Sequence, residues 1–283
     1  YILPLLALDD VRIASIAAAL RSSEPKARIV VHWPPLVTGQ KATVLPDLLT
    51  AAAQWPIDGV CTAWPAYWDP KQENRLRIAD TTANLFNTPA LIEAADRGAT
   101  TLSPSLELNI DQLTEALSDF SALPDAPAVT IERPLYGRLR LMSTAYCPIG
   151  KNQEQCRRCV RSSQPDDGQP DWLTDRKGAR FLVLPHPRTC QADLLGSDLL
   201  AVPDEFATLR CVLGPAQSWR SRLYFIDETP SERRALIESA RQLLSASPAA
   251  GKKASSDFLA LAQQIATRLD TRLTTGHYQR GVI

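Results

Sequence analysis

The fold class is decided by residues 76–132, whose sequence is LRIADTTANLFNTPALIEAADRGATTLSPSLELNIDQLTEALSDFSALPDAPAVTIE. Three short apolar runs in this stretch are typical of strands: 76–80, 99–103 and 126–132. Two longer segments between them begin with helix-start signals, at Thr88-Pro89 and at Asn109. Strands that alternate with helices are joined by crossovers into parallel sheets, so this stretch predicts an α/β fold.

The same alternation continues on both sides of this stretch. Before it we expect strands at 3–8, 28–32 and 59–63 and helices at 10–21 and 46–54; after it we expect strands at 199–202 and 222–226. A (β/α) barrel or partial barrel is the leading architecture, and a doubly wound open sheet is the alternative. No glycine-rich phosphate fingerprint follows any predicted strand, which weakens a nucleotide-binding version of the open sheet.

The composition changes along the chain and predicts four parts. Residues 1–135 form the strand-helix barrel portion, and residues 136–200 form an irregular, cysteine-rich metal-binding insertion. Residues 201–245 return to the α/β pattern. Residues 246–283 are expected to contain a Ser/Ala/Gly/Lys-rich linker at 246–256, a terminal helix at 257–273 and a polar tail.

Charge and hydropathy exclude some classes of function. The 31 Lys and Arg equal the 31 Asp and Glu, so the chain lacks the overall positive charge of a simple nucleic-acid-binding module. No apolar stretch approaches about 18 residues, so no membrane-spanning helix is expected. The start lacks the features of a signal peptide, and we expect a cytoplasmic protein. It also lacks an initiating Met, which suggests a fragment or one half of a longer chain.

Four of the six cysteines are clustered, at Cys147, Cys156, Cys159 and Cys190. In a reducing compartment, clustered cysteines favour metal binding over disulfides. One tight pair with two isolated ligands suits an iron–sulfur cluster and a tetrahedral Zn²⁺ site about equally well. The two remaining cysteines, Cys61 and Cys211, lie in predicted strand and helix segments, and we interpret both as buried core thiols.

Several stretches together resemble the collagenase-like family of unassigned peptidases, family U32, and in particular the later half of its long members. The resemblance rests on residues 78–88 (IADTTANLFNT), 102–108 (LSPSLEL), 132–138 (ERPLYGR), 142–150 (MSTAYCPIG) and 175–178 (DRKG), with Cys190 downstream.

The resemblance implies a barrel-type fold with a [4Fe–4S] cluster on Cys147, Cys156, Cys159 and Cys190. It also implies a role in hydroxylation without molecular oxygen, acting on an RNA base or a quinone precursor of ubiquinone. In that family prephenate is implicated as an oxygen source for the tRNA branch, and the ubiquinone members act as pairs of related subunits. The expected partners are therefore a related subunit or a missing N-terminal half, RNA, and an anionic small molecule such as prephenate.

Two other functions stay open. The family name points to a metal-dependent peptidase, but the sequence has neither a His-Glu-x-x-His stretch nor a Gly-x-Ser-x-Gly elbow. The chain could also be a non-catalytic scaffold subunit with a structural metal.

Polar residues recur at successive predicted strand ends, where barrel enzymes place their chemistry. The candidate catalytic residues are Asn84, Asn87, Glu107 and Glu132, joined by Arg138 and Arg176 as binders of a carboxylate or phosphate. The asparagines could equally cap local turns. Among the histidines, His32 ends a strand and is more readily structural, and His186 lies near Cys190 as a candidate hydrogen-bond donor beside the metal.

Overall fold

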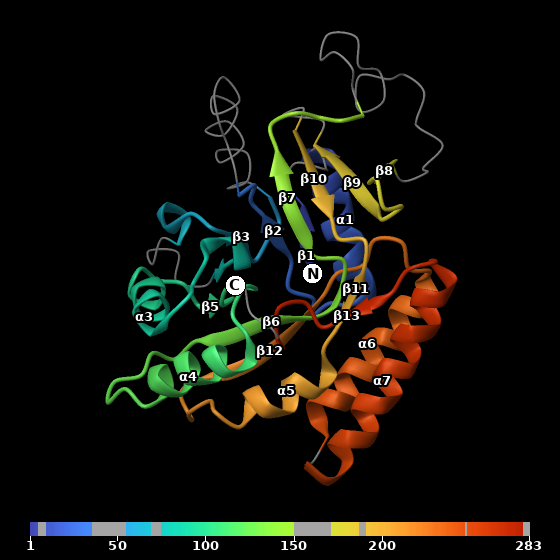
Figure 1. The fold of residues 1–283 in the computed structure, drawn as a ribbon. Helices are drawn as coiled ribbons and strands as arrows, with labels where there is room; N and C mark the ends of the chain where they lie inside the picture. Colours follow the sequence, from blue (N-terminus) through green and yellow to red (C-terminus); the bar gives the residue numbers. More distant parts are fainter. Residues whose placement is uncertain are drawn as a thin grey trace. The chain divides into compact units, whose positions relative to one another are not determined.

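The computed structural model describes residues 1–4, 10–35, 55–68, 75–149, 171–186, 191–246 and 248–279 (Figure 1). The chain divides into two compact units. Unit 1 contains Tyr1–Thr82 and Arg140–Leu195, and unit 2 contains Ala83–Leu139 and Gly196–Ile283. One expected helix, at 46–54, and three expected metal ligands, Cys156, Cys159 and Cys190, lie outside the described residues.

Unit 1 contains four parallel strands in chain order. They are β1 (Ile2–Pro4), β2 (Val30–His32), β3 (Gly59–Thr62) and β4 (Leu76–Ala79), and each pairs with the next. The helix α1 (Asp10–Ser23) connects β1 to β2. Short 3₁₀ turns follow β3 at Pro65–Tyr67 and β4 at Thr81–Ala83.

Side chains in and beside these strands alternate between two apolar clusters, as the two faces of a strand require. Ile29, Val31 and Trp33 pack with Ile13 and Ala17 of α1. On the opposite side, Val30, Cys61 and Ile78 form a second cluster from three neighbouring strands. Burial on both faces explains why these strands are continuous apolar runs instead of alternating apolar and polar residues.

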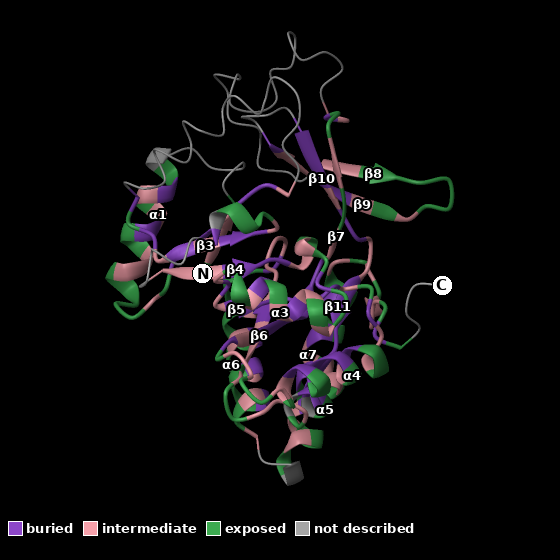
Figure 2. Ribbon diagram, turned by 90° about the vertical axis from the view of Figure 1, so that its left-hand side faces the viewer, coloured by how far each residue is buried: buried purple, intermediate pink, exposed green. Residues whose placement is uncertain are grey.

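Unit 1 also contains an antiparallel sheet in the order β7-β10-β9-β8. Its strands are β7 (Arg140–Thr144), β8 (Asp171–Thr174), β9 (Arg180–His186) and β10 (Gln191–Leu195). Figure 2 shows that β10 is largely buried, whereas β8 is partly exposed. The described part of the segment expected to be irregular is thus regular, because hairpin pairing satisfies its backbone groups locally.

Unit 2 is arranged around the long strand β6 (Thr130–Gly137). Both β5 (Thr101–Leu102) and β12 (Ser218–Leu223) run parallel to β6. The strand β11 (Leu199–Ala201) runs antiparallel to β6 and pairs in parallel with β13 (Leu273–Thr274). The chain is therefore an α/β protein with mostly parallel strand pairing. The expected barrel is not confirmed, since a regular (β/α) barrel contains no antiparallel pair.

The described helices of unit 2 are α3 (Thr88–Asp96), α4 (Ile110–Ser121), α5 (Pro203–Arg210), α6 (Pro230–Ser245) and α7 (Pro248–Arg268). Side-chain caps start three of them, namely α3, α4 and α6, and a proline near the first position starts α5. Capping boxes start α4, from Asn109 to Gln112, and α6, from Thr229 to Glu232. In Figure 1, α6 and α7 lie side by side.

Helix α7 differs from the expectation of a linker at 246–256 followed by a helix at 257–273. It begins at Pro248 and ends at Arg268. Proline is well suited to a first helical position, and the following Ala249 and Ala250 are strong helix formers, so local preference favours the earlier start.

In the sequence, unit 2 is interrupted by residues 140–195, which belong to unit 1. The backbone N–H of Gly196 donates to the carbonyl oxygen of Leu139 over 2.8 Å. The chain therefore leaves unit 2 and returns to it at two residues that are hydrogen-bonded to each other. Within the described ranges, none of the helices combines the length and the apolar character needed to cross a bilayer.

Candidate functional site

Three chemically reactive side chains meet at the carboxyl ends of β2, β3 and β4 in unit 1. His32 is the last residue of β2 and is the register partner of Cys61 in β3, while Asp80 directly follows β4. The Nε2 atom of His32 lies 3.4 Å from Oδ2 of Asp80, and Sγ of Cys61 lies 3.5 Å from Oδ1. Cys61 and Asp80 are buried. Parallel pairing thus brings an imidazole, a thiol and a carboxylate together from positions far apart in the chain.

Asp80 has two further partners. The hydroxyl of Thr82 donates to Oδ2 over 2.7 Å, and Nη2 of Arg140 in β7 lies 3.3 Å from the same oxygen. A buried carboxylate is costly unless it is paired and hydrogen-bonded, and these contacts provide both. Arg140 therefore connects the parallel strands of unit 1 to its antiparallel sheet.

A second buried carboxylate, Asp193 in β10, lies on the other side of Arg140. Nη1 of Arg140 is 3.5 Å from Oδ2 of Asp193, Nε2 of His186 is 3.0 Å from the same oxygen, and Ser143 Oγ donates to Oδ1 over 2.5 Å. Burial raises the pKa of Asp193, but the hydrogen bond and charge of His186, with Arg140 and Ser143, outweigh it, so the pKa is lower than usual. Asp193 is therefore held as a carboxylate.

We call these six residues the polar network: His32, Cys61, Asp80, Arg140, His186 and Asp193. The two carboxylates share one guanidinium, and each also contacts an imidazole. The Nδ1 atom of His186 is buried and has no hydrogen-bond partner among the described residues. Imidazole, thiolate and carboxylate are the usual ligands of transition metals and the usual carriers of protons in enzymes.

Cys147 is the only proposed cluster ligand within the described ranges. Its side chain is buried and forms no disulfide. It lies three residues after Thr144 in β7, and Thr144 pairs directly with Ala192 of β10, two residues after Cys190. Antiparallel pairing therefore brings the sequence positions that flank Cys147 and Cys190 to one end of this strand pair.

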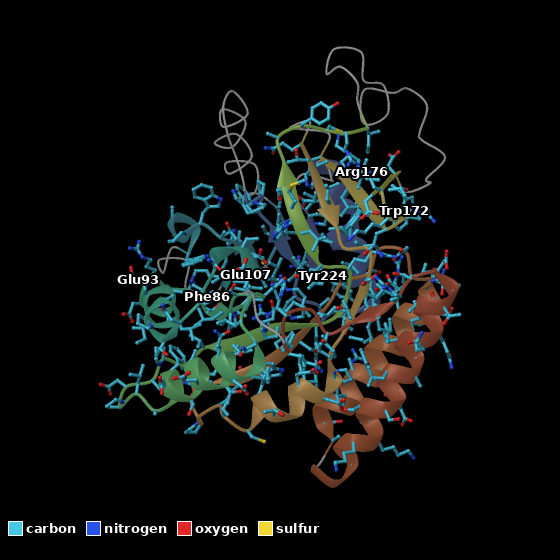
Figure 3. The ribbon with its side chains drawn as sticks, viewed as in Figure 1. Phe86, Glu93, Glu107, Trp172, Arg176 and Tyr224 are labelled. Atoms are coloured by element: carbon cyan, nitrogen blue, oxygen red, sulfur yellow. The ribbon has the colours of Figure 1, made fainter. Side chains whose placement is uncertain are left out.

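The predicted pocket residues Asn84, Asn87 and Glu107 lie on loops of unit 2 and are exposed. Asn87 is the N-cap of α3, and its Oδ1 accepts a hydrogen bond from the N–H of Ala90 over 3.0 Å. Asn84 has a positive φ of 53°, a conformation that asparagine tolerates better than most residues. Figure 3 shows Glu107 on the loop that follows β5. Local turn and cap chemistry accounts for both asparagines, and their catalytic role stays a prediction.

Glu132 is buried in β6 and forms ion pairs within unit 2. It accepts a short hydrogen bond from Arg222 Nη2 and another from Ser103 Oγ at 3.3 Å. Arg220 Nη1 is 3.9 Å from its second oxygen. These contacts join β5, β6 and β12, so Glu132 has a structural role in the sheet whether or not it acts on a substrate.

The two predicted anion-binding arginines differ in their surroundings. Arg138 is buried; its guanidinium contacts Asp227 Oδ2 at 3.2 Å and donates to the carbonyl oxygens of Gly196 and Ser197. Arg176 is exposed at the turn between β8 and β9, as Figure 3 shows. The structure thus does not describe a shared anion site for these two side chains, and their binding role stays a prediction.

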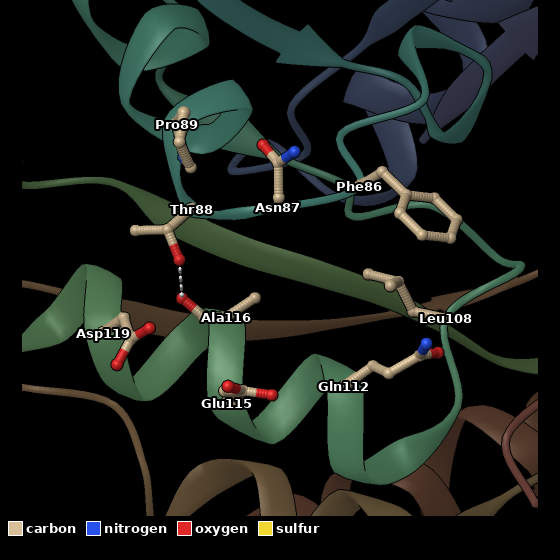
Figure 4. Close-up of a pocket in the computed structure, with 9 residues that line it drawn as sticks. All are labelled: Phe86, Asn87, Thr88, Pro89, Leu108, Gln112, Glu115, Ala116 and Asp119. Carbon is tan, nitrogen blue, oxygen red and sulfur yellow. Dashed lines mark hydrogen bonds between the residues drawn. The ribbon is translucent and has the colours of Figure 1, made fainter.

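A groove of about 350 Å³ in unit 2 lies between the start of α3 and helix α4 (Figure 4). It is lined by Phe86, Asn87, Thr88, Pro89, Leu108, Gln112, Glu115, Ala116 and Asp119. The Thr88 hydroxyl donates to the carbonyl oxygen of Ala116 over 3.2 Å and joins the two helices. Asn87 is the only predicted site residue in this lining.

Sequence reasoning missed most of the polar network. Cys61 is buried, as predicted, but its thiol also contacts Asp80. Cys211, by contrast, is exposed, so its assignment to the core was wrong; it is the C-cap of the short helix α5. Asp80 could have been found from its place directly after a strand, the same signal that selected Glu132.

Comparisons with known proteins give little further information. No protein-family model matches the chain, and no curated protein matches it. Among solved structures, the U32 peptidase Mk0906 aligns at 14% identity with a TM-score of 0.37, covering 48% of this chain. The chain spans 60% of the length of that structure. A likeness at this level does not establish a family or a fold.

Proposed function

We propose that this chain is an iron–sulfur protein of an oxygen-independent hydroxylation system that acts on an RNA base or a quinone precursor. The observation that carries the proposal is the pairing of Thr144, three residues before the buried Cys147, with Ala192, two residues after Cys190 in the sequence. This pairing brings the flanks of two predicted ligands together, as a cluster bound by Cys147, Cys156, Cys159 and Cys190 would require.

The donor set fits such a cluster. Thiolates are the ligands of [4Fe–4S] clusters, and the described donor, Cys147, is a buried thiol that no disulfide occupies. When bound, the cluster would supply one-electron redox chemistry.

The residues of the polar network would handle protons and orientation. Arg140 holds the carboxylates of Asp80 and Asp193 in place. His186 Nε2 contacts Asp193 Oδ2 at 3.0 Å and helps to hold that carboxylate.

Anaerobic purification from iron-supplied cells tests the cluster. We expect brown protein with about four irons per chain, as four-cysteine ligation predicts. Cys147→Ser should lose most of the iron, whereas Cys211→Ser, which changes an exposed cysteine, should retain it. A colourless wild-type protein without iron would overturn the proposal.

Activity assays then separate the candidate functions. The wild-type protein, with and without prephenate, is incubated anaerobically with RNA or with a quinone precursor, and products are analysed by mass spectrometry. Gain of one oxygen atom that depends on Cys147 supports the hydroxylase. Hydrolysis of a collagen peptide that survives Cys147→Ser supports the metal-dependent peptidase instead, and activity only after addition of a related subunit supports the paired arrangement.

A further inference from the structure

We propose that His32, Cys61 and Asp80 bind a single divalent transition-metal ion, most suitably Zn²⁺, at a site separate from the four clustered cysteines. The three residues each offer one ligand atom, and these atoms all lie within 4.8 Å of one another. The site does not rest on the proposed iron–sulfur function, since it shares no ligand with that cluster.

The distances from His32 and Cys61 to the two oxygens of Asp80 are compatible with one tetrahedral ion, and the His32 distance is long for a direct hydrogen bond. With the usual zinc bond lengths, tetrahedral ligands are separated by about 3.3 Å for nitrogen and oxygen and about 3.5 Å for sulfur and oxygen. The observed separations are 3.4 Å for His32 Nε2 and Asp80 Oδ2, and 3.5 Å for Cys61 Sγ and Asp80 Oδ1. A direct N–H···O bond would be shorter, near about 2.9 Å.

The charges around the site also favour a cation. Two buried carboxylates, Asp80 and Asp193, contact the guanidinium of Arg140, and these three groups together carry one negative charge. A divalent ion that displaces the thiol proton of Cys61 to solvent adds two positive charges and one negative charge. The sum of carboxylates, thiolate, guanidinium and metal is then neutral.

The protein holds the ligands in the way that metal sites require. The parallel register fixes His32 opposite Cys61, and Thr82 and Arg140 bind the Asp80 carboxylate from outside the set. Such supporting contacts orient ligands and tune their basicity. The ligand chemistry, with one imidazole, one thiolate and one carboxylate, is that of zinc and its neighbours rather than of Mg²⁺ or Ca²⁺.

Three protein ligands leave a fourth tetrahedral position for water or a substrate atom, as in catalytic zinc sites. His32 retains 18% exposure of its side chain and Arg140 retains 19%, whereas Cys61 is fully buried. The site therefore suits a bound water or a small oxygen ligand.

Metal analysis and cobalt substitution of the full chain test the site. The four clustered cysteines would also bind Co²⁺ through their thiolates. Chelator-treated full-length protein in which Cys147, Cys156, Cys159 and Cys190 are all replaced by Ser is therefore the background for every variant, and it is titrated anaerobically with Co²⁺ while the thiolate-to-cobalt charge-transfer band is measured. We expect a band that saturates at one ion per chain and is competed by Zn²⁺. Cys61→Ser should abolish the band, and His32→Gln and Asp80→Asn should each weaken Co²⁺ binding by at least tenfold, as loss of one ligand implies.

Matched controls separate this site from the four-cysteine cluster and from misfolding. Cys211→Ser should leave the band unchanged, and circular dichroism should show that the Cys61→Ser protein is folded. The background that lacks the four clustered cysteines cannot hold the iron–sulfur cluster, so this proposal and the iron–sulfur proposal can fail separately. A band that persists after Cys61→Ser in this background would overturn the site. Absence of stoichiometric binding in the background itself would leave only a Cys61–Asp80 hydrogen bond and overturn it too.

Discussion

At the scale of single residues, two glycines have opposite requirements. Gly59 opens β3, and a Cβ atom there would lie against the backbone carbonyl of Leu76, closer than real Cβ contacts occur. Gly251 lies in α7, and a Cβ atom there would meet nothing within 4 Å. The close approach of the neighbouring strand requires glycine at position 59, whereas the interior of a helix only tolerates glycine at position 251.

We therefore expect Gly59→Ala to lower the free energy of unfolding by roughly 2 kcal/mol or more, because β3 and β4 must separate to admit the methyl group. Gly251→Ala should raise it by about 0.5 to 1 kcal/mol through helix propensity. Urea denaturation of both variants checks this pair. If both substitutions changed the free energy of unfolding by the same amount in the same direction, the close approach of Leu76 would not be the reason for glycine at position 59.

The residue scale also shows why the site was only partly predictable. Asn87 and Thr229 act through neighbours three residues away, so their caps can be predicted from local sequence. Asp80 gains its partner Arg140 from 60 positions away, and that contact depends on how the two sheets of unit 1 meet. No local pattern contains this information. The burial of Cys61 could be predicted from the apolar residues around it in the sequence. Its contact with Asp80 could not, because that contact depends on the pairing of two strands.

At the scale of elements, one carboxylate ties α1 to the strands of unit 1. Asp58 Oδ2 accepts from Arg21 in α1 over 2.9 Å and from the backbone N–H of Ile29 over 2.7 Å, and Arg28 lies 3.6 Å from Oδ1. Burial raises the pKa of Asp58, but the Ile29 hydrogen bond and the two arginines outweigh it, so the pKa lies below its usual value.

A lowered pKa means that the Asp58 carboxylate stabilises the fold above its unfolded-state pKa, and that this contribution is lost as pH falls through the folded-state pKa. Asp58→Asn should therefore cost about 1 to 2 kcal/mol at pH 7, and the difference from wild type should shrink near pH 3. Denaturation midpoints at the two pH values measure it. Glu93→Gln, in the exposed Glu93–Arg97 pair, should change stability by under about 0.5 kcal/mol. A deficit for Asp58→Asn that does not depend on pH would contradict the assignment.

The helices and strands were predicted better than the partners and directions of the strands. The strand and helix order around residues 76–132 follows from periodicity and caps, and β4, α3, β5, α4 and β6 all appear there. The antiparallel sheet of β7 to β10 was not expected, because strand direction is set by partners far apart in the sequence, such as Ser143 and Asp193, which are 50 residues apart. The start of α7 at Pro248 was missed because a Gly- and Ser-containing stretch resembles a linker by composition alone.

At the scale of the whole molecule, neither unit is one continuous segment. The chain leaves unit 2 after Leu139 and returns at Gly196, and these two residues are hydrogen-bonded through their backbones. The core of unit 2 also has its own polar supports, such as Arg133, which donates to the carbonyl oxygens of Pro104 and Ser105. The two ends of unit 2 that flank residues 140–195 are therefore held together by a backbone hydrogen bond.

Deletion of residues 140–195 from a chain that begins at Ala83, with a two-glycine link from Leu139 to Gly196, should give a folded, monomeric unit 2. Its far-ultraviolet circular dichroism should show helix, and thermal unfolding should be cooperative. Arg133→Leu in the same shortened chain should abolish that transition, because it leaves buried carbonyl groups unsatisfied. Aggregation of the shortened chain with the intact Arg133 would show that unit 2 depends on the deleted residues.

The hydrogen bond between Leu139 and Gly196 has a consequence for how such a protein can change over generations. A segment that enters and leaves through adjacent residues can be lengthened, replaced or lost without moving the ends of the unit that receives it. The strands β7 to β10, together with the intervening cysteines, form such a segment. New chemistry could therefore be acquired or discarded at this junction by a single genetic event, while the helices and strands of the host unit keep their sequence.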